Sequence, residues 1–140
     1  GHLEAGGNPI SREIEALGNP DIVFTGSVAH PFDYLLNADA FCLSSTWEGA
    51  PISLLEALAA GIPAICTPVG GIPDVITDGV NGILATGLTV ESFAEAIARF
   101  RAQRESFKRD VIRRDFAQRF SIAACANRHL ALYAGNGRAA

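Results

Sequence analysis

The feature that most constrains this chain is the alternation of short apolar runs with helical segments. The runs are apolar throughout, rather than at every second position, and they are rich in β-branched, aromatic and small residues. They occupy residues 22–25, 40–43, 63–66 and, more weakly, 82–84. Strands that are apolar on both faces are typical of a parallel sheet covered by helices on both sides. The pattern therefore predicts an α/β fold with a Rossmann-like parallel sheet flanked by helices.

The segments between and after these runs have helical patterns. Helices are predicted at residues 11–17, 31–37, 51–60, 72–76, 90–101, 105–120 and 122–133. Two apolar stripes at helical spacing predict faces turned to the core, namely Phe93, Ile97 and Phe100, and Ile112, Phe116 and Phe120. Residues before Ile22 leave room for one helix but no clear strand. We therefore expect residues 1–140 to form one domain that is truncated at its N-terminus and lacks about one βαβ unit.

Composition narrows the class of protein further. The chain is 49% hydrophobic and 19% charged, which is enough for a core and too little charge for a disordered chain. No apolar run reaches the roughly 18 residues of a membrane span, and no leader-like segment opens the chain. The three cysteines form no close pair, so we expect small buried hydrophobes in a reducing cytoplasm. No metal site and no cofactor are predicted.

Charge is distributed unevenly along the chain. Residues 1–98 hold twelve acidic residues and one basic residue, Arg12, whereas residues 99–140 hold ten basic and three acidic residues. The acidic part argues against a nucleic-acid partner, which usually requires a basic face with aromatic side chains. The basic part alternates with acidic residues in a way that is typical of helix surfaces. The charge split also favours association between copies, so a homo-oligomer is one expectation.

One stretch carries most of the chemical information. It runs Ser44-Ser45-Thr46-Trp47-Glu48-Gly49-Ala50-Pro51-Ile52-Ser53-Leu54-Leu55-Glu56-Ala57, directly after a predicted strand. Ligands bind beyond the carboxyl ends of strands in such sheets, and Pro51 suits the first turn of a helix. The amides of Ile52 and Ser53 would then face an anion at the helix N-terminus. Carboxylates at Glu48 and Glu56 suit sugar or ribose hydroxyls, although each alone fits an ordinary surface position equally well.

The whole chain resembles the donor-binding, C-terminal domain of GT-B-fold retaining glycosyltransferases, the glycosyl transferases group 1 or family 4-like enzymes. Glu48 and Glu56 match the Glu-x7-Glu signature of that family. Further blocks match in the same order: residues 24–28 (Phe-Thr-Gly-Ser-Val), 61–63 (Gly-Ile-Pro), 67–76, 78–82 and 120–133. The signature alone is a weak pattern, but several blocks in register make the resemblance specific.

The resemblance implies a role for each matching residue. Glu56 would hold the ribose hydroxyls of the donor, and Glu48 would act at the catalytic centre beside the transferred sugar. Gly49, Ala50 and Pro51 would belong to the substrate-binding turn, in which Ile52 and Ser53 offer amides to the diphosphate. The backbone of Val28 would contact the base of a UDP- or GDP-type donor. For Gly70–Gly71, a tight turn is at least as good an interpretation as a binding role.

Departures from the family pattern shape the functional hypothesis. The Arg and Lys that clamp the diphosphate in the family have no counterpart in these residues, and we expect the acceptor-binding domain to be absent as well. We therefore expect a hexosyltransferase-type donor domain that binds a nucleoside diphosphate-sugar and is inactive alone. The alternative is a non-catalytic, oligomerising interaction module that keeps the fold. A dinucleotide-dependent oxidoreductase is disfavoured because no Gly-x-Gly-x-x-Gly follows a strand.

Overall fold

The computed structural model describes residues 9–135. The chain divides into two compact units, residues 1–31 and residues 32–140. In the first unit, helix α1 spans Pro9–Ala16, and a turn follows in which the Asp21 amide donates to the Asn19 side chain at 3.0 Å. Part of the sequence resemblance to the family, residues 24–28, lies in this unit.

The strand predicted at residues 22–25 is not present. These residues have no regular secondary structure and belong to no ladder among the described residues, and the side chains of Ile22, Val23 and Phe24 are exposed. A β-branched, aromatic run fits a half-buried pleated surface, yet it becomes a strand only when a neighbouring strand pairs with it. No strand among the described residues pairs with residues 22–25, so the strand predicted there from β-propensity was wrong.

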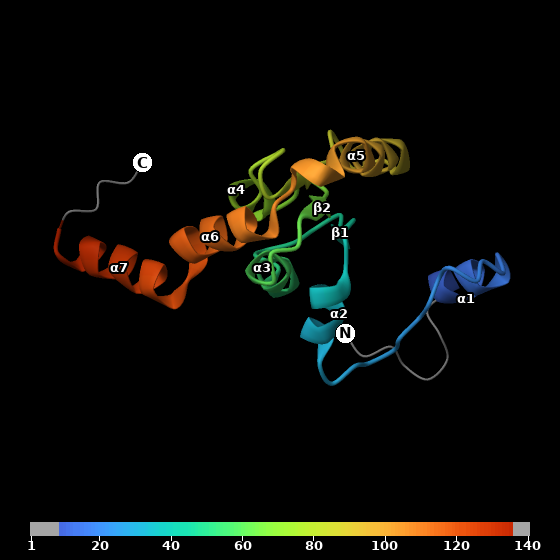
Figure 1. The fold of residues 1–140 in the computed structure, drawn as a ribbon, viewed down its shortest axis with the longest axis horizontal. Helices are drawn as coiled ribbons and strands as arrows, with labels where there is room; N and C mark the ends of the chain where they lie inside the picture. The colour runs from blue at the N-terminus through green and yellow to red at the C-terminus, as the bar shows by residue number, and fades with distance from the viewer. Residues whose placement is uncertain (1–8, 136–140) are drawn as a thin grey trace. The chain divides into compact units, whose positions relative to one another are not determined.

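The second unit contains a three-stranded parallel sheet and its helices (Figure 1). Its elements are α2 (Pro31–Asn37), β1 (Phe41–Leu43), α3 (Ile52–Ala59), β2 (Ala64–Cys66), α4 (Ile72–Val75), β3 (Gly82–Leu84), α5 (Val90–Gln103), a 3-10 turn (Arg104–Ser106), α6 (Arg109–Phe120) and α7 (Ile122–Tyr133). The strand order is β1-β2-β3, with Ala64 opposite both Phe41 and Gly82. The predicted α/β fold with a parallel sheet flanked by helices is therefore confirmed.

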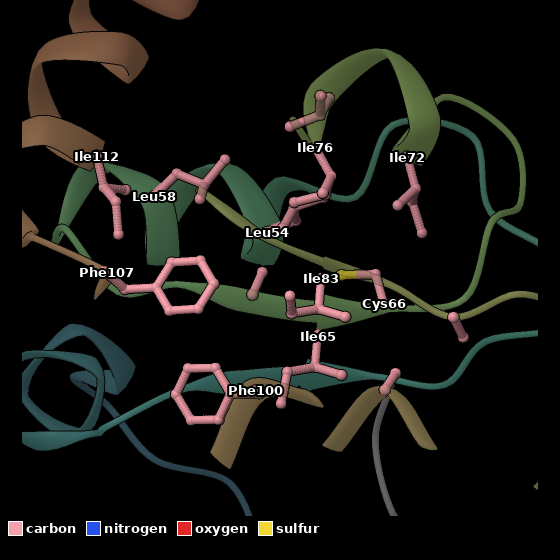
Figure 2. Packing of buried hydrophobic residues seen from close by; sticks show 14 residues of the cluster. Leu54, Leu58, Ile65, Cys66, Ile72, Ile76, Ile83, Phe100, Phe107 and Ile112 are labelled. Atoms are coloured by element: carbon pink, nitrogen blue, oxygen red, sulfur yellow. The ribbon is translucent and has the colours of Figure 1, made fainter. Parts of the chain in front are cut away.

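The core lies on both sides of the central strand. Every residue of β2 is buried, and Figure 2 shows Leu54 and Leu58 of α3 on one side of the strands and Phe100 of α5 on the other. Helix α6 packs beside α3 and contributes Ile112 to the same core. Because both faces of β2 are covered, its uninterrupted apolar character is explained.

Three details differ from the predictions. The helix predicted at residues 105–120 begins only at Arg109, because the chain first forms the 3-10 turn and then buries Phe107 against Phe100, with ring centroids 5.5 Å apart. On α5, Ala96 rather than Ile97 faces the core, and Ile97 is 37% exposed. The buried stripe therefore runs through positions i+3 and i+7 from Phe93 rather than through i+4.

The cysteines are the third difference, because of the three expected to be buried only Cys66 is; Cys125 on α7 is exposed, and so is Cys42. It lies on β1, an outer strand of the described sheet, in register with Ile65 and Ile83. Helix α5 packs over β2 and β3, where it covers these two isoleucines. The same face is left open at β1, and the thiol of Cys42 lies there.

Arginines of the basic C-terminal part hold the unit together. Arg109 donates to the carbonyl oxygens of Leu36, in the last turn of α2, and of Ala38, just after it, both at 2.8 Å. Arg119 donates to the carbonyl oxygen of Asp74 at 2.6 Å, where α4 ends. Cationic side chains are favourable at helix C-termini because the last carbonyls lack partners within the helix. These residues are therefore structural contacts as well as helix surface.

A buried asparagine joins three elements. The side chain of Asn81 is fully buried before β3, and its Nδ2 donates to the Val75 carbonyl oxygen at 3.1 Å and to Asp115 Oδ2 on α6 at 3.0 Å. Its Oδ1 accepts from the Thr77 amide at 2.8 Å. All of its hydrogen-bonding groups are used, as burial of an amide requires.

Among the described residues, no helix is long and apolar enough to cross a bilayer.

We expect Asn81→Ala to lower the free energy of unfolding by about 1–3 kcal/mol, because the Thr77 amide loses its acceptor inside the protein. Urea denaturation followed by circular dichroism measures the change. Asn37→Ala is the matched control, since that side chain donates to Asp33 on the exposed surface of α2. An equal loss in the two variants would contradict the buried network.

Cysteine reactivity gives a second test of the core. Burial, with a smaller contribution from Cys42, raises the pKa of the Cys66 thiol from 9.0 to about 12. At pH 8 iodoacetamide should alkylate the exposed Cys125 readily and Cys66 only after unfolding, because the thiolate is the reactive form. The folded protein holds the Cys66 proton more tightly than the unfolded chain. The contribution of this thiol to stability should therefore fall as the pH rises from about 9 toward 12.

Mass spectrometry of the alkylated peptides, with and without urea, measures the reaction rates. In urea the three cysteines should react at similar rates. Alkylation of Cys66 in the folded protein at the rate of Cys125 would show that β2 is not buried.

Candidate functional site

The sequence-predicted residues from Glu48 to Pro51 follow the carboxyl end of β1, and Ile52, Ser53 and Glu56 lie on α3, the helix after them. Two segments leave the sheet at the carboxyl ends of β1 and β2: residues 44–51, which we call the Glu48 loop, and residues 67–71, which lead into α4. In open parallel sheets the crevice at this edge is the usual place for a ligand. The topology therefore places these residues where the sequence predicted a site.

Glu48 is half-buried and held from within its own loop. The hydroxyl of Ser45 donates to Glu48 Oε1 at 2.6 Å. The backbone of Ser45 is itself anchored, because the hydroxyl of the buried Thr67 donates to the Ser45 carbonyl oxygen at 2.5 Å. A carboxylate that accepts a hydrogen bond from a fixed hydroxyl has a restricted orientation. The Glu48 carboxylate is thus tied, through Ser45, to the end of β2.

Gly70 and Gly71 pack against the same loop. The Gly71 amide donates to the Gly49 carbonyl oxygen at 2.8 Å. Gly70 has a positive φ of +54°, and a Cβ built on it would overlap the carbonyl oxygen of Glu48. The two glycines therefore form the turn before α4 and also allow the close approach of the Glu48 loop.

Helix α3 begins with open amide groups. Its N-cap is Pro51, and no side chain of the described residues caps the first turn. The Leu54 and Leu55 amides donate to the Pro51 carbonyl oxygen, whereas the Ile52 and Ser53 amides have no acceptor within the described chain. Pro51, which was predicted to be the first helical residue, is thus the N-cap, and the helix begins one position later at Ile52. The open donors and the helix dipole together favour an anion here.

The other predicted residues are placed less tightly. Glu56 lies on α3 and is exposed, and no ion pair joins it or Glu48 to a cation among the described residues. Gly49 and Ala50 are exposed, and a Cβ at Gly49 would meet only open space. Val28 belongs to the first unit, where it is half-buried, and its contact with a base stays a prediction.

A hollow next to the Glu48 loop escaped the sequence analysis. It has a volume of about 310 Å3 and opens at the carboxyl ends of the strands. Its lining comprises Ser44, Thr67, Leu88, Thr89, Val90 and Phe93. The available signal was a hydroxyl residue directly after each of two apolar runs, Ser44 after β1 and Thr67 after β2. Within residues 9–135, no group of three His, Cys, Asp or Glu side chains is placed to hold a metal ion.

Comparison with known proteins gives consistent results. The family model described as "Glycosyl transferases group 1" matches residues 5–115. The MMP α-(1→4)-mannosyltransferase of Mycolicibacterium hassiacum is 30% identical over 137 residues, which cover 94% of this chain and 33% of that protein. The teichuronic acid biosynthesis glycosyltransferase TuaC of Bacillus subtilis, so named putatively, is 43% identical over 68 residues, or 49% of this chain and 17% of that protein.

Solved structures agree with the sequence comparison. Anabaena HepE in complex with UDP superposes with a TM-score of 0.76 at 22% identity, over 90% of this chain and 36% of that one. The lipopolysaccharide outer core galactosyltransferase WaaB, in its apo form, gives a TM-score of 0.73 at 25% identity, over 89% and 36%. The chain thus spans about a third of the length of these structures.

Proposed function

The chain belongs to the glycosyl transferases group 1 family, and on that premise we propose that it binds the nucleoside diphosphate-sugar donor of a retaining glycosyltransferase. The reaction would be hexosyl transfer to a glycan, lipid or small-molecule acceptor. HepE has been solved with UDP and with UDP-glucose, which makes a UDP-type donor the first choice for testing. A GDP-type donor is the second.

The observation that carries the proposal is the open N-terminus of α3 beside a held carboxylate. The amides of Ile52 and Ser53 supply donors for a diphosphate, and they begin the helix that directly follows the Glu48 loop. In sugar transfer, negative charge develops on the departing diphosphate, and fixed amides stabilise it without having to reorganise. The exposed backbone at Gly49 and Ala50 leaves room for the ligand to approach.

The two carboxylates have different roles in this proposal. Glu56, exposed on α3, accepts hydrogen bonds from the ribose hydroxyls. Glu48 contacts the transferred sugar near the reacting carbon, where its second oxygen, Oε2, has no hydrogen bond within the described chain. Positioning of the sugar against the acceptor would supply most of the rate enhancement. The backbone of Val28 would read the base.

We propose that the chain binds donors weakly and transfers no sugar by itself. Residues 1–98 carry Arg12 as their only basic residue, so the diphosphate would rely on amides rather than on a cationic clamp. A closed, water-excluding cleft and an acceptor site need further protein, and the relatives are about three times as long as this chain. The three cysteines are free, which fits a reducing compartment, and we place the protein in the cytoplasm.

The rival proposal is a non-catalytic interaction module. It is favoured by α7, which has no buried residue and exposes Ile122, Leu130 and Tyr133. Self-association into an oligomer would then be its function, with the open face of β1 as a further contact surface. Binding of a nucleoside diphosphate at the α3 N-terminus distinguishes the two proposals, because the rival does not require it.

We expect UDP or GDP to bind with a dissociation constant of roughly millimolar order, about −4 kcal/mol. In an NMR titration of the 140-residue chain, the amide resonances of Ile52 and Ser53 should shift together. Glu56→Gln should weaken binding several-fold, because a neutral amide is a poorer acceptor for ribose hydroxyls than a carboxylate.

The matched control is Glu95→Gln, which removes an equally exposed charge on α5. It should leave the titration unchanged. Absence of any shift at Ile52 and Ser53 with either nucleotide would remove the donor site. Micromolar binding would show that cations are not needed for affinity at this helix terminus.

A further inference from the structure

We propose that Ser45 and Gly70 are positioning residues that set the place and orientation of the Glu48 carboxylate. Ser45 acts through its hydroxyl, and Gly70 acts by allowing two backbone segments to touch. The inference rests on the proposed function of Glu48 beside the transferred sugar. Neither residue is required to contact the donor.

Ser45 acts as a bridge between the sheet and the carboxylate. Its hydroxyl donates to Glu48 Oε1 at 2.6 Å, and its own carbonyl oxygen accepts from Thr67 at 2.5 Å. Thr67 follows β2 directly and is only 3% exposed, so its position is fixed by the core. A hydrogen bond to a charged group is stronger than a neutral one and restricts the long Glu side chain. The orientation of the Glu48 carboxylate is therefore fixed, through Ser45 and Thr67, by the buried strand β2.

The glycine pair fixes the backbone that carries Glu48. The carbonyl oxygen of Glu48 lies where a Cβ of Gly70 would stand, and a Cβ on Gly71 would come within 2.9 Å of the Gly49 carbonyl oxygen. The hydrogen bond from the Gly71 amide to Gly49 closes the contact. Any side chain at Gly70 would push the Glu48 loop away from the end of β2. The glycines thus hold Glu48 at a defined distance from the sheet edge.

The arrangement matters because Glu48 has no other anchor. It forms no ion pair with the cations of residues 9–135, and its loop has no regular secondary structure. A carboxylate acts at a reacting centre only if it is held in a productive geometry by its supporting residues. Loss of Ser45 or Gly70 should therefore move Glu48 without disturbing the amides at the start of α3.

The first experiment needs no ligand. The carbon-13 carboxyl resonance of Glu48 is assigned in the 140-residue chain and in three variants. Ser45→Ala should shift it clearly, whereas Ser45→Thr, which keeps the hydroxyl, should return it toward the wild-type position. Thr46→Ala is the matched control, because Thr46 is exposed and adjacent. A Glu48 resonance that is unmoved by Ser45→Ala overturns the role of Ser45.

The glycine is tested against a second glycine of positive φ. Gly79 has a φ of +77°, but a Cβ there would meet only open space. Gly79→Ala and Gly70→Ala should both lower the melting temperature, because alanine is strained in this region. Only Gly70→Ala should also move the Glu48 carboxyl and Gly71 amide resonances. If Gly70→Ala does not fold, Gly71→Ala, whose φ is −81°, tests the same contact.

Donor binding separates this inference from the proposed function. The probes are two pairs, UDP-glucose with UDP and GDP-mannose with GDP. The measured quantity is the affinity for the sugar nucleotide divided by the affinity for the free nucleotide of the same pair. Ser45→Ala should reduce the ratio roughly three- to tenfold, the value expected for one ordinary hydrogen bond, and leave the affinity for the free nucleotide unchanged.

The outcomes fall into three groups. A displaced Glu48 resonance together with a reduced ratio supports both proposals. A displaced resonance with an unchanged ratio supports the positioning roles and overturns the contact between Glu48 and the sugar. An undisplaced resonance in Ser45→Ala and in both glycine variants overturns the inference, whatever the nucleotides do.

Discussion

The site depends on one constraint, the burial of β2 on both faces. The strand is only three residues long, and so are its two partners, which makes the sheet unstable without its helices. Helices α3 and α5 cover it from opposite sides, and this fixes where its carboxyl end emerges (Figure 2). Thr67 is the next residue, and Gly70 follows within one turn. Because Thr67 and Gly70 follow β2 so closely and contact the Glu48 loop, the packed core fixes the position of that loop.

The basic and acidic parts of the sequence form ion pairs with each other in the folded chain. Arg99 pairs with Asp78 at 2.6 Å, and Arg104 approaches Asp39 at 3.5 Å, so basic residues of α5 and of the turn after it meet acidic residues of the first part. Exposed pairs of this kind contribute little stability individually. Their number nevertheless means that opposite charges already meet within one chain. The charge argument for association between copies is weakened accordingly, while the open face of β1 keeps that hypothesis testable.

Features that are determined by neighbouring residues in the sequence were predicted correctly, whereas features that depend on contacts between distant segments were not. The helices at residues 31–37 and 122–133 and the strand at 82–84 were predicted with their observed bounds, because apolar periodicity and turn residues mark them locally. The predicted strand at residues 22–25 and the burial of Cys42 were wrong, because pairing and covering depend on distant segments. In the site, the open start of α3 was foreseeable from Pro51 and the residues after it. The hydrogen bond of Ser45 and the packing of Gly70 on Glu48 were not, because each joins segments whose meeting only the sheet order determines.

The electrostatics of the edge suggest how such a site selects its ligand. Glu48 carries a negative charge in the loop before α3 and Glu56 carries one within the helix, and the amides of Ile52 and Ser53 offer only the partial positive charge of a helix N-terminus. A bare diphosphate would be attracted by the amides and repelled by the carboxylates, which lie within the roughly 8 Å over which charges act at physiological salt if they share its crevice. Ribose and sugar hydroxyls change this balance, because they donate to the carboxylates and stand between them and the phosphates. In the proposed donor site, the described residues would supply amides and carboxylates, and such a set would favour a ligand that presents hydroxyl groups on both sides of its diphosphate. In such a site, the proposed positioning of Glu48 by Ser45 and Gly70 would matter more for ligand selection than it would in a site dominated by cations.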